Sequence, residues 1–166
     1  PAKLMTNLAK KHGEKEAVKY FIDELKVSKE KTALALKVAE MEAPVIESSS
    51  PDSFSLYVAI PFCPSRCTYC SFVSHSNDSA KKLIPQYVDK VCEELIYTAE
   101  IAKRLSLKLE SVYIGGGTPT VLTAEQLNKI TDTIKENYDF TYIKEYTIEA
   151  GRPDSTDEAK LGVMKN

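Results

Sequence analysis

Three segments rich in β-forming residues alternate with amphipathic helical segments in this 166-residue chain. The strand-like segments cover residues 54–60, 109–114 and 145–150. Apolar residues at helical spacing predict one helix over about residues 80–105 and a second helix after residue 123. This alternation predicts an α/β fold with a parallel sheet or barrel, whose functional groups gather at the carboxyl ends of the strands.

Local signals mark where these helices begin. Pro85 fits only the first turn of a helix, so the first helix could begin close to it. Thr123 is the expected N-cap of the second helix, and Gln126 occupies the reciprocal position of a capping box. Residues 157–166, after the third strand, do not indicate a closing element, and we expect the chain to be cut at both ends.

The first forty residues predict two helices. Phe21 belongs to the apolar face of the first, and Ser28 is the expected N-cap of the second. The second helix carries an apolar stripe made of Leu34, Val38 and Met41. We therefore expect three parts: a helical accessory region over residues 1–42, a linker over residues 43–53 that is rich in Ser, Pro and acids, and an α/β core over residues 54–166.

Composition narrows the class of protein. Lys and Arg number 22 against 24 acidic residues, and this net charge of −2 favours neither nucleic acid nor an anionic membrane surface. No apolar run is long enough to span a bilayer, and the first residues are charged and lack the apolar core of a signal peptide. We therefore expect a cytoplasmic protein, in which cysteines stay reduced.

Three of the four cysteines lie in the segment CPSRCTYC, directly after the first predicted strand. Cys63, Cys67 and Cys70 can bind three irons of a [4Fe-4S] cluster and leave the fourth iron open to a small chelating molecule. Structural zinc is the competing interpretation, and His75 could complete a set of three cysteines and one histidine. Cys92 lies on the apolar face of a predicted helix, where we expect a buried hydrophobe.

With this motif, the run YVAIPFCPSRCTYC, the later GGGTPT and the strand ending in EAGRPD resemble the radical SAM superfamily, whose members cleave S-adenosylmethionine (SAM). The order of the motifs is similar to that of the oxygen-independent coproporphyrinogen III oxidase (dehydrogenase) branch. The resemblance implies a partial, TIM-like (βα) barrel, cut after about three of the six βα units that the family has. It also implies that this chain would be inactive alone.

The resemblance assigns roles to residues that follow the predicted strands. Gly116, Gly117 and Thr118 would contact SAM, and glycines there let the backbone approach a ligand closely because they lack a Cβ. Glu149 would bind the ribose hydroxyls of SAM, and a carboxylate at the end of an apolar strand does need a partner. Tyr57 matches a family tyrosine that lies against the SAM and cluster site.

The resemblance also implies an activity. The parent protein would form a 5′-deoxyadenosyl radical from SAM and oxidatively decarboxylate coproporphyrinogen III to protoporphyrinogen IX, with flavodoxin or ferredoxin as electron donor. The serine after Cys70 departs from the oxidases, which have a further cysteine near this point, so a haem chaperone-like relative or a radical SAM enzyme with another substrate remains open. The sequence names no catalytic residue that touches the substrate.

Overall fold

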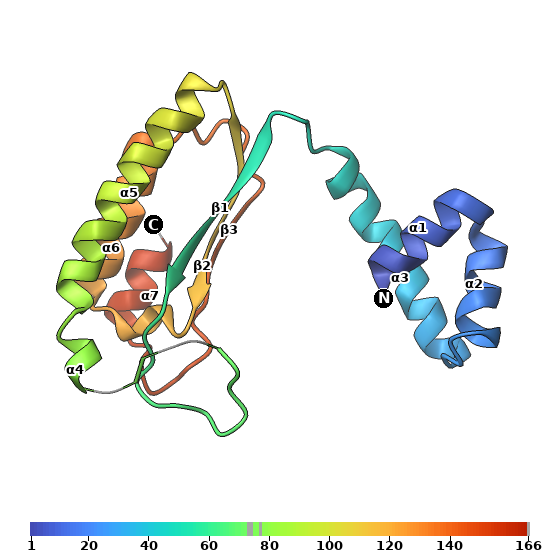
Figure 1. Cartoon of the computed structure of the whole chain (residues 1–166), viewed down its shortest axis with the longest axis horizontal. Helices are drawn as coiled ribbons and strands as arrows, with labels where there is room; N and C mark the ends of the chain where they lie inside the picture. The colour runs from blue at the N-terminus through green and yellow to red at the C-terminus, as the bar shows by residue number, and fades with distance from the viewer. Residues whose placement is uncertain (73–74, 77, 166) are drawn as a thin grey trace. The chain divides into compact units, whose positions relative to one another are not determined.

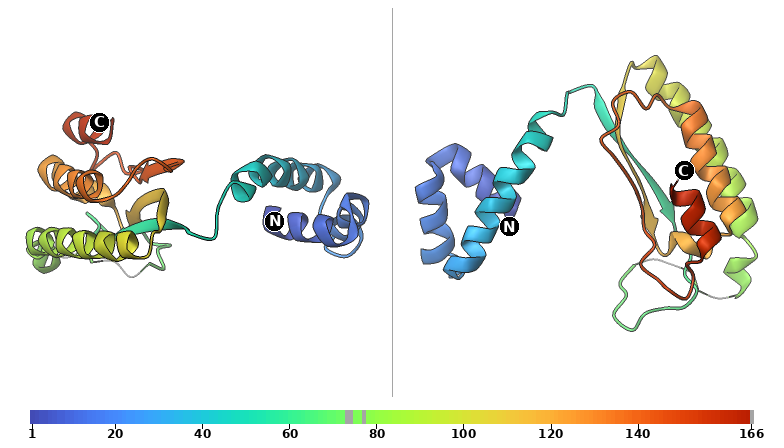
Figure 2. Two further views of the ribbon diagram at one scale, coloured as in Figure 1. Left: turned by 90° about the horizontal axis from the view of Figure 1, so that it is seen from above. Right: turned by 180° about the vertical axis from the view of Figure 1, so that it is seen from behind.

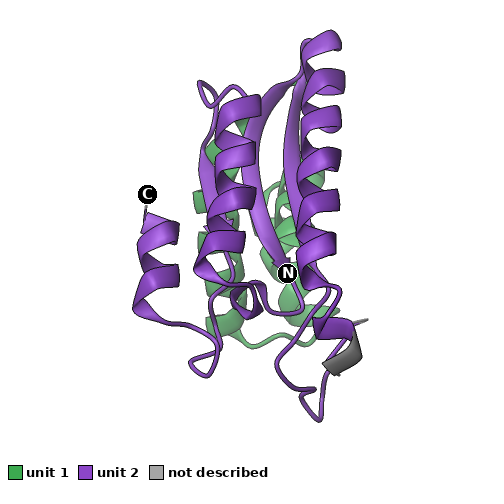
Figure 3. Ribbon diagram, turned by 90° about the vertical axis from the view of Figure 1, so that its left-hand side faces the viewer, with its two compact units in different colours: residues 1–51 green, residues 52–166 purple. Residues whose placement is uncertain are grey.

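The computed structural model describes residues 1–72, 75–76 and 78–165 (Figure 1). The chain divides into two compact units, Pro1–Pro51 and Asp52–Asn166, which Figure 3 colours separately. The first unit contains helices only, whereas the second combines a parallel sheet with helices.

The first unit is built from helices α1 (Ala2–His12), α2 (Glu14–Asp23) and α3 (Lys29–Glu47). Two helices were expected here, and α1 is the additional one. Gly13 separates α1 from α2 with a positive φ of 86°, a conformation that favours glycine. The Ser28 side chain caps α3 as predicted, accepting a hydrogen bond from the Lys31 backbone N–H at 3.3 Å.

Small side chains, rather than the predicted stripe, form the buried face of α3. Leu34 and Met41 are 61% and 71% exposed, while α3 buries Thr32, Ala35 and Ala39. The apolar stripe predicted from Leu34, Val38 and Met41 is therefore not the buried face of α3, which meets α1 and α2 through smaller side chains. Together with Ala35 and Ala39, the core of the unit consists of Met5, Ala17 and Phe21.

Helix α3 also continues further than the sequence indicates. It ends at Glu47 with Pro44 inside it, so residues 43–47 of the expected linker are helical. A proline removes one backbone N–H of the helix, but residues after it can still donate to earlier carbonyls. The Ser48 N–H does so, donating to the Pro44 carbonyl at 3.1 Å.

The second unit contains a three-stranded parallel sheet in the order β1 (Ser53–Ile60), β2 (Lys108–Gly116) and β3 (Glu145–Ile148). Spatial order thus follows chain order. Helices α5 (Ile84–Arg104) and α6 (Ala124–Asn137) make the two crossovers and lie on the same face of the sheet (Figures 1 and 2). A doubly wound sheet would place helices on both faces, so this arrangement is that of part of a (βα) barrel.

The main core lies between the sheet and these helices. Strands β1 and β2 alternate, with Val58, Ile60, Val112 and Ile114 buried toward the helices. Their intervening residues point to the other face, where Tyr57 remains 56% exposed. Helix α6 starts with the predicted capping box, in which Thr123 and Gln126 bond each other's backbone N–H.

Three boundaries differ from the sequence-based expectation. The first long helix is divided into α4 (Asp78–Lys81) and α5, and Pro85 lies in the first turn of α5. The third strand ends at Ile148, before Glu149.

The stretch after the third strand, where no closing element was expected, contains helix α7 (Glu158–Lys165), which packs on α6. The Asp157 carboxylate accepts a hydrogen bond from the Lys160 N–H at the start of this helix. A short 3₁₀ turn, η1 (Pro119–Val121), follows the glycines after β2.

The predicted fold class is confirmed by this second unit, which has three parallel βα units in an open sheet. Within the described residues, no helix is both long enough and apolar enough to cross a bilayer.

Candidate functional site

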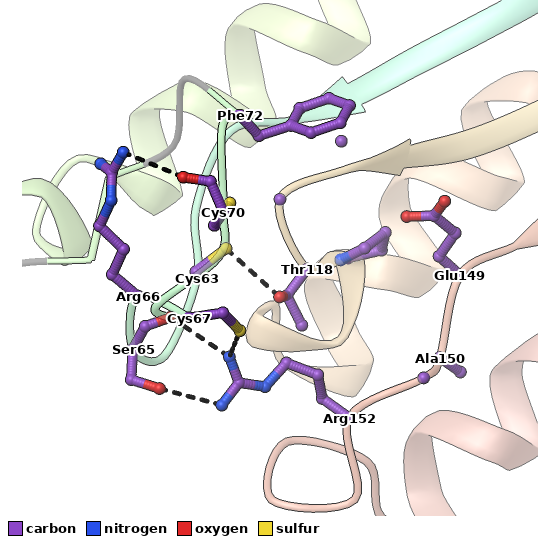
Figure 4. A pocket seen from close by; sticks show the side chains of 14 residues that line it. Cys63, Ser65, Arg66, Cys67, Cys70, Phe72, Thr118, Glu149, Ala150 and Arg152 are labelled. Atoms are coloured by element: carbon purple, nitrogen blue, oxygen red, sulfur yellow. Dashed lines mark hydrogen bonds between the residues drawn. The ribbon is translucent and has the colours of Figure 1, made fainter.

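A cavity of about 560 Å³ opens where the three parallel strands end, as expected for the carboxyl edge of such a sheet. Seven of the eight predicted site residues line it (Figure 4), and only Tyr57 does not. The lining comes from three segments: the cysteine loop after β1, the glycine loop after β2 and the residues after β3. The predicted residues in the lining are Cys63, Cys67, Cys70, Gly116, Gly117, Thr118 and Glu149.

The base of the cysteine loop is held by backbone pairing. Phe62 and His75 form a parallel bridge, in which the Cys63 N–H donates to the His75 carbonyl at 2.9 Å and the His75 N–H donates to the Pro61 carbonyl at 2.8 Å. The Phe62 ring is buried and meets the edge of Tyr87 with 5.2 Å between centroids. His75 thus closes the loop through its backbone, while its side chain is exposed.

The glycine loop continues the sheet pairing into the cysteine loop. The Gly117 N–H donates to the Ile60 carbonyl and the Thr118 N–H to the Phe62 carbonyl, both at 2.8 Å. These two amides are therefore committed to β1 and its extension. The Thr118 carbonyl already accepts from the Val121 N–H at 3.0 Å, in the turn that follows. The Gly117 carbonyl is therefore the better placed of the two to accept from a ligand such as an ammonium group.

Gly117 has a packing requirement of its own. A Cβ at this position would lie 2.6 Å from the Phe62 carbonyl oxygen, 2.9 Å from the Ile60 carbonyl oxygen and 3.0 Å from the Cys63 sulfur. Both carbonyls accept hydrogen bonds from the glycine loop, Ile60 from the Gly117 N–H and Phe62 from the Thr118 N–H, so neither can move aside without breaking this pairing. Glycine is thus needed here for the two loops to touch, before any ligand is considered.

Thr118 links the two loops through its side chain. The residue is 5% exposed, and its hydroxyl donates to the sulfur of Cys63 at 3.4 Å (Figure 4). This hydrogen bond orients the first cysteine of the motif from the opposite loop. The predicted contact of Thr118 with SAM stays a prediction.

Glu149 is the half-buried carboxylate that the sequence required to be paired, and Tyr113 pairs it. The Tyr113 hydroxyl donates to Glu149 Oε1 at 2.5 Å, and this hydrogen bond is the main cause of a raised pKa for Tyr113. Tyr57 stacks on the Tyr113 ring, with 5.8 Å between centroids and 21° between planes. Tyr57 thus reaches the site indirectly, by packing on the residue that holds Glu149.

Arg152, after β3, reaches across the cavity to the cysteine loop (Figure 4). Its guanidinium donates to the Ser65 carbonyl at 3.2 Å, to Ser65 Oγ at 2.9 Å and to the sulfur of Cys67 at 3.8 Å. The same group forms an ion pair with Asp154 at 2.8 Å. One arginine therefore connects the end of β3 to two residues of the loop.

A zinc ion and a [4Fe-4S] cluster place different geometric requirements on three cysteines. Among residues 1–72, 75–76 and 78–165, no three His, Cys, Asp or Glu side chains converge as one metal ion requires. Zinc lies about 2.3 Å from each cysteine sulfur, so its sulfur ligands are about 4 Å apart. In a [4Fe-4S] cluster each thiolate binds a different iron, which needs wider spacing around a cavity.

The fourth cysteine lies away from this site. Cys92 is 6% exposed in the core, and its sulfur lies 3.9 Å from the Lys129 carbonyl oxygen. The prediction of a buried hydrophobe at this position is confirmed.

Because Cys92 lies elsewhere, the described lining of the cavity has three cysteines. Three thiolates suit a cluster in which one iron is left for another ligand.

Two residues of the site were missed from the sequence. Tyr113 alternates with buried Val112 and Ile114, so the period of the strand could have placed it on the same face as Tyr57. Arg152 gave no such signal, because its partners Ser65 and Cys67 are more than eighty positions away in sequence.

Comparison with known proteins agrees with this combination of a partial (βα) barrel and a three-cysteine loop. The family model of the Radical SAM superfamily matches residues 57–165, from β1 through α7. The chain belongs to the radical SAM superfamily.

Individual relatives carry two kinds of name, that of a coproporphyrinogen oxidase-like protein and that of a heme chaperone. The oxygen-independent coproporphyrinogen-III oxidase-like protein HemZ of Bacillus subtilis is 29% identical over 165 residues, covering 98% of this chain and 32% of HemZ. The heme chaperone HemW of Lactococcus lactis is 41% identical over 105 residues, covering 63% of this chain and 25% of HemW. Since the HemZ match covers nearly the whole chain, it includes the helical first unit.

A solved structure agrees with the fold. Coproporphyrinogen III oxidase (HemN) of Escherichia coli, a radical SAM enzyme, superimposes with a TM-score of 0.55 and 28% identity, over 67% of this chain and 25% of HemN. The three parallel βα units therefore correspond to part of the radical SAM barrel. The chain spans about a third of the length of HemZ and about a quarter of the lengths of HemW and HemN.

Proposed function

We propose that the protein binds a [4Fe-4S] cluster and SAM in the cavity at the strand ends, as part of a radical SAM enzyme that acts on a porphyrinogen. One observation carries this proposal: the three cysteines, the glycine loop and Glu149 come from three different segments and line one cavity. With reductant, a bound cluster would supply the electron that cleaves SAM to a 5′-deoxyadenosyl radical.

The residues of this chain would do the positioning. Cys63, Cys67 and Cys70 would hold three irons, and the carbonyls of the glycine loop would accept hydrogen bonds from the amino group of SAM. Glu149 would accept from the ribose hydroxyls with the carboxylate oxygen that Tyr113 leaves free. Each role uses an acceptor or thiolate that the geometry brings to the cavity.

The substrate assignment rests on the relatives. HemZ is named for its likeness to the oxidase and matches nearly the entire chain, which favours oxidative decarboxylation of coproporphyrinogen III. The reaction would need a one-electron donor such as flavodoxin or ferredoxin. HemW, with higher identity over a shorter stretch, favours a haem chaperone as the second candidate.

The deciding experiment is an anaerobic assay of the reconstituted protein at its native length. With SAM, dithionite and coproporphyrinogen III, we expect 5′-deoxyadenosine and protoporphyrinogen IX, each absent when SAM is omitted. A parallel assay follows transfer of haem to an apo-haemoprotein. Haem transfer without porphyrinogen conversion would support the chaperone, and zinc-containing, colourless protein would overturn the proposal.

The 166 residues by themselves are expected to form the cluster and to give less than one 5′-deoxyadenosine per chain. The sheet has three strands in the described residues and does not close into a barrel. The sheet face that carries Tyr57 is therefore open to water, and a substrate bound next to it would be exposed. Multiple turnovers by this chain alone would contradict the expectation.

Tyr113→Phe should weaken SAM binding about five- to tenfold. The variant keeps the stacking with Tyr57 but frees Glu149 from the hydroxyl that orients it, and one hydrogen bond to a charged group contributes about 1.5–3 kcal/mol, part of which water replaces. Equilibrium dialysis with labelled SAM on cluster-loaded protein measures the change. Tyr142→Phe is the matched control, since Tyr142 is exposed and outside the cavity lining, and it should bind SAM like the unsubstituted protein.

A further inference from the structure

We propose that Arg152 is a positioning residue for the cluster, which fixes the cysteine loop and raises the reduction potential of the cluster by donating to the sulfur of Cys67. The inference rests on the proposed cluster and adds a role for a residue after β3. Asp154 is the one near-sequence partner given for the Arg152 guanidinium in the described residues, and the guanidinium's contacts with Ser65 and Cys67 exist only in the folded chain.

The loop contacts of Arg152 form a clamp. Two guanidinium nitrogens reach Ser65, one to the backbone carbonyl and the other to the hydroxyl, in the fork geometry that arginine provides. Ser65 lies between Cys63 and Cys67, so the clamp holds the segment that joins two of the three thiolates. Arg66, its neighbour, has a different role, since its guanidinium contacts the Cys70 carbonyl at 3.5 Å.

The contact with sulfur adds an electrostatic effect. The N–H of Arg152 lies 3.8 Å from the Cys67 sulfur, within the range of an N–H···S hydrogen bond. Hydrogen bonds to the sulfurs and nearby positive charge favour the reduced cluster, which carries one more electron. Arg152 provides both at one ligand, while Thr118 provides a neutral hydrogen bond at another, Cys63.

Asp154 moderates this charge. Its carboxylate accepts from Arg152 Nε at 3.1 Å and from Nη2 at 2.8 Å, so the guanidinium is partly neutralised and held in place. The pair gives two substitutions with opposite expected signs: removing the arginine charge should lower the potential, and removing the carboxylate charge should raise it.

An EPR-monitored redox titration of the anaerobically reconstituted protein tests the inference without SAM or substrate. Arg152→Gln should reduce the equilibrium constant for one-electron reduction about tenfold, which is a shift of about 59 mV to lower potential. Arg152→Lys keeps the charge but loses the fork, and should show a smaller shift in the same direction. Asp154→Asn should shift the potential upward.

Arg104→Gln is the matched control. Arg104 ends α5, at the edge of the sheet opposite the cavity, so this variant loses the same charge far from the cysteines. Equal potentials for Arg152→Gln and Arg104→Gln would overturn the inference. Should Arg152→Gln not retain the cluster, a downward or absent shift in Asp154→Asn would overturn it instead.

The outcomes for the two proposals are distinct. An unsubstituted protein that forms no iron–sulfur cluster would overturn the proposed function, and this inference with it. A protein that forms the cluster and cleaves SAM, but whose potential does not respond to Arg152 and Asp154, would overturn only the inference.

Discussion

Alanine at any one of Cys63, Cys67 and Cys70 is expected to abolish the cluster. Reconstituted unsubstituted protein should be brown and contain about four irons per chain, and each variant should fall below about one. The reason is geometric, because the described lining of the cavity has three cysteines and so has no spare thiolate to replace a lost one. Iron and sulfide analysis of the reconstituted proteins measures the loss.

Cys92→Ala is the matched control for this series. Its sulfur lies in the core between α5 and α6, so the variant should keep its iron while losing about 1 kcal/mol of stability from the smaller side chain. Full iron in any variant of the three loop cysteines, or loss of iron in Cys92→Ala, would contradict the assignment of the ligands.

Gly117→Ala is expected to have the largest effect among single substitutions that remove no chemical group. The added methyl would overlap the carbonyl oxygens of Phe62 and Ile60, which belong to the paired backbone of the sheet edge. Overpacking of this kind costs about 1–3 kcal/mol, and rigid backbone neighbours place it at the upper end. Urea unfolding followed by circular dichroism measures the loss, and iron content should fall in parallel because the Cys63 sulfur lies 3.0 Å from the new Cβ.

Gly162→Ala provides the comparison. This glycine lies in α7, and apart from its chain neighbours and the helix's own backbone no described atom lies within 4 Å of the position that the alanine methyl group would take. Alanine should therefore leave stability unchanged or raise it by up to about 1 kcal/mol through its helix propensity. Unchanged stability and iron content in Gly117→Ala would show that the two loops are not in contact.

Local chemistry made much of this protein predictable from its sequence. The strands were visible because β-formers alternate or cluster over short runs, and the caps at Ser28 and Thr123 were visible because capping depends on residues three positions apart. The cysteine motif was visible for the same reason, since its three thiolates lie within eight positions. That these cysteines line a cavity follows from their place after the first strand of a parallel sheet, because the carboxyl ends of such strands lie at one edge.

Features that depend on distant residues were not predictable in this way. The buried face of α3 was decided by where α1 and α2 pack on it, so Ala35 and Ala39 are buried and Leu34 is exposed. Gly117 was interpreted as a ligand-binding glycine, but the approach of the β1 extension is what excludes a Cβ there.

In the site, too, some features depend on nearby residues and others on residues far apart in sequence. The sequence specified which thiolates and which carboxylate are available, because those are properties of single residues and short motifs. The pairing of Tyr113 with Glu149 follows from the register of β2 and β3, and the reach of Arg152 to Ser65 and Cys67 follows from the meeting of two loops at one sheet edge. Such contacts join positions far apart in the chain, and only the packed sheet brings them within hydrogen-bonding distance.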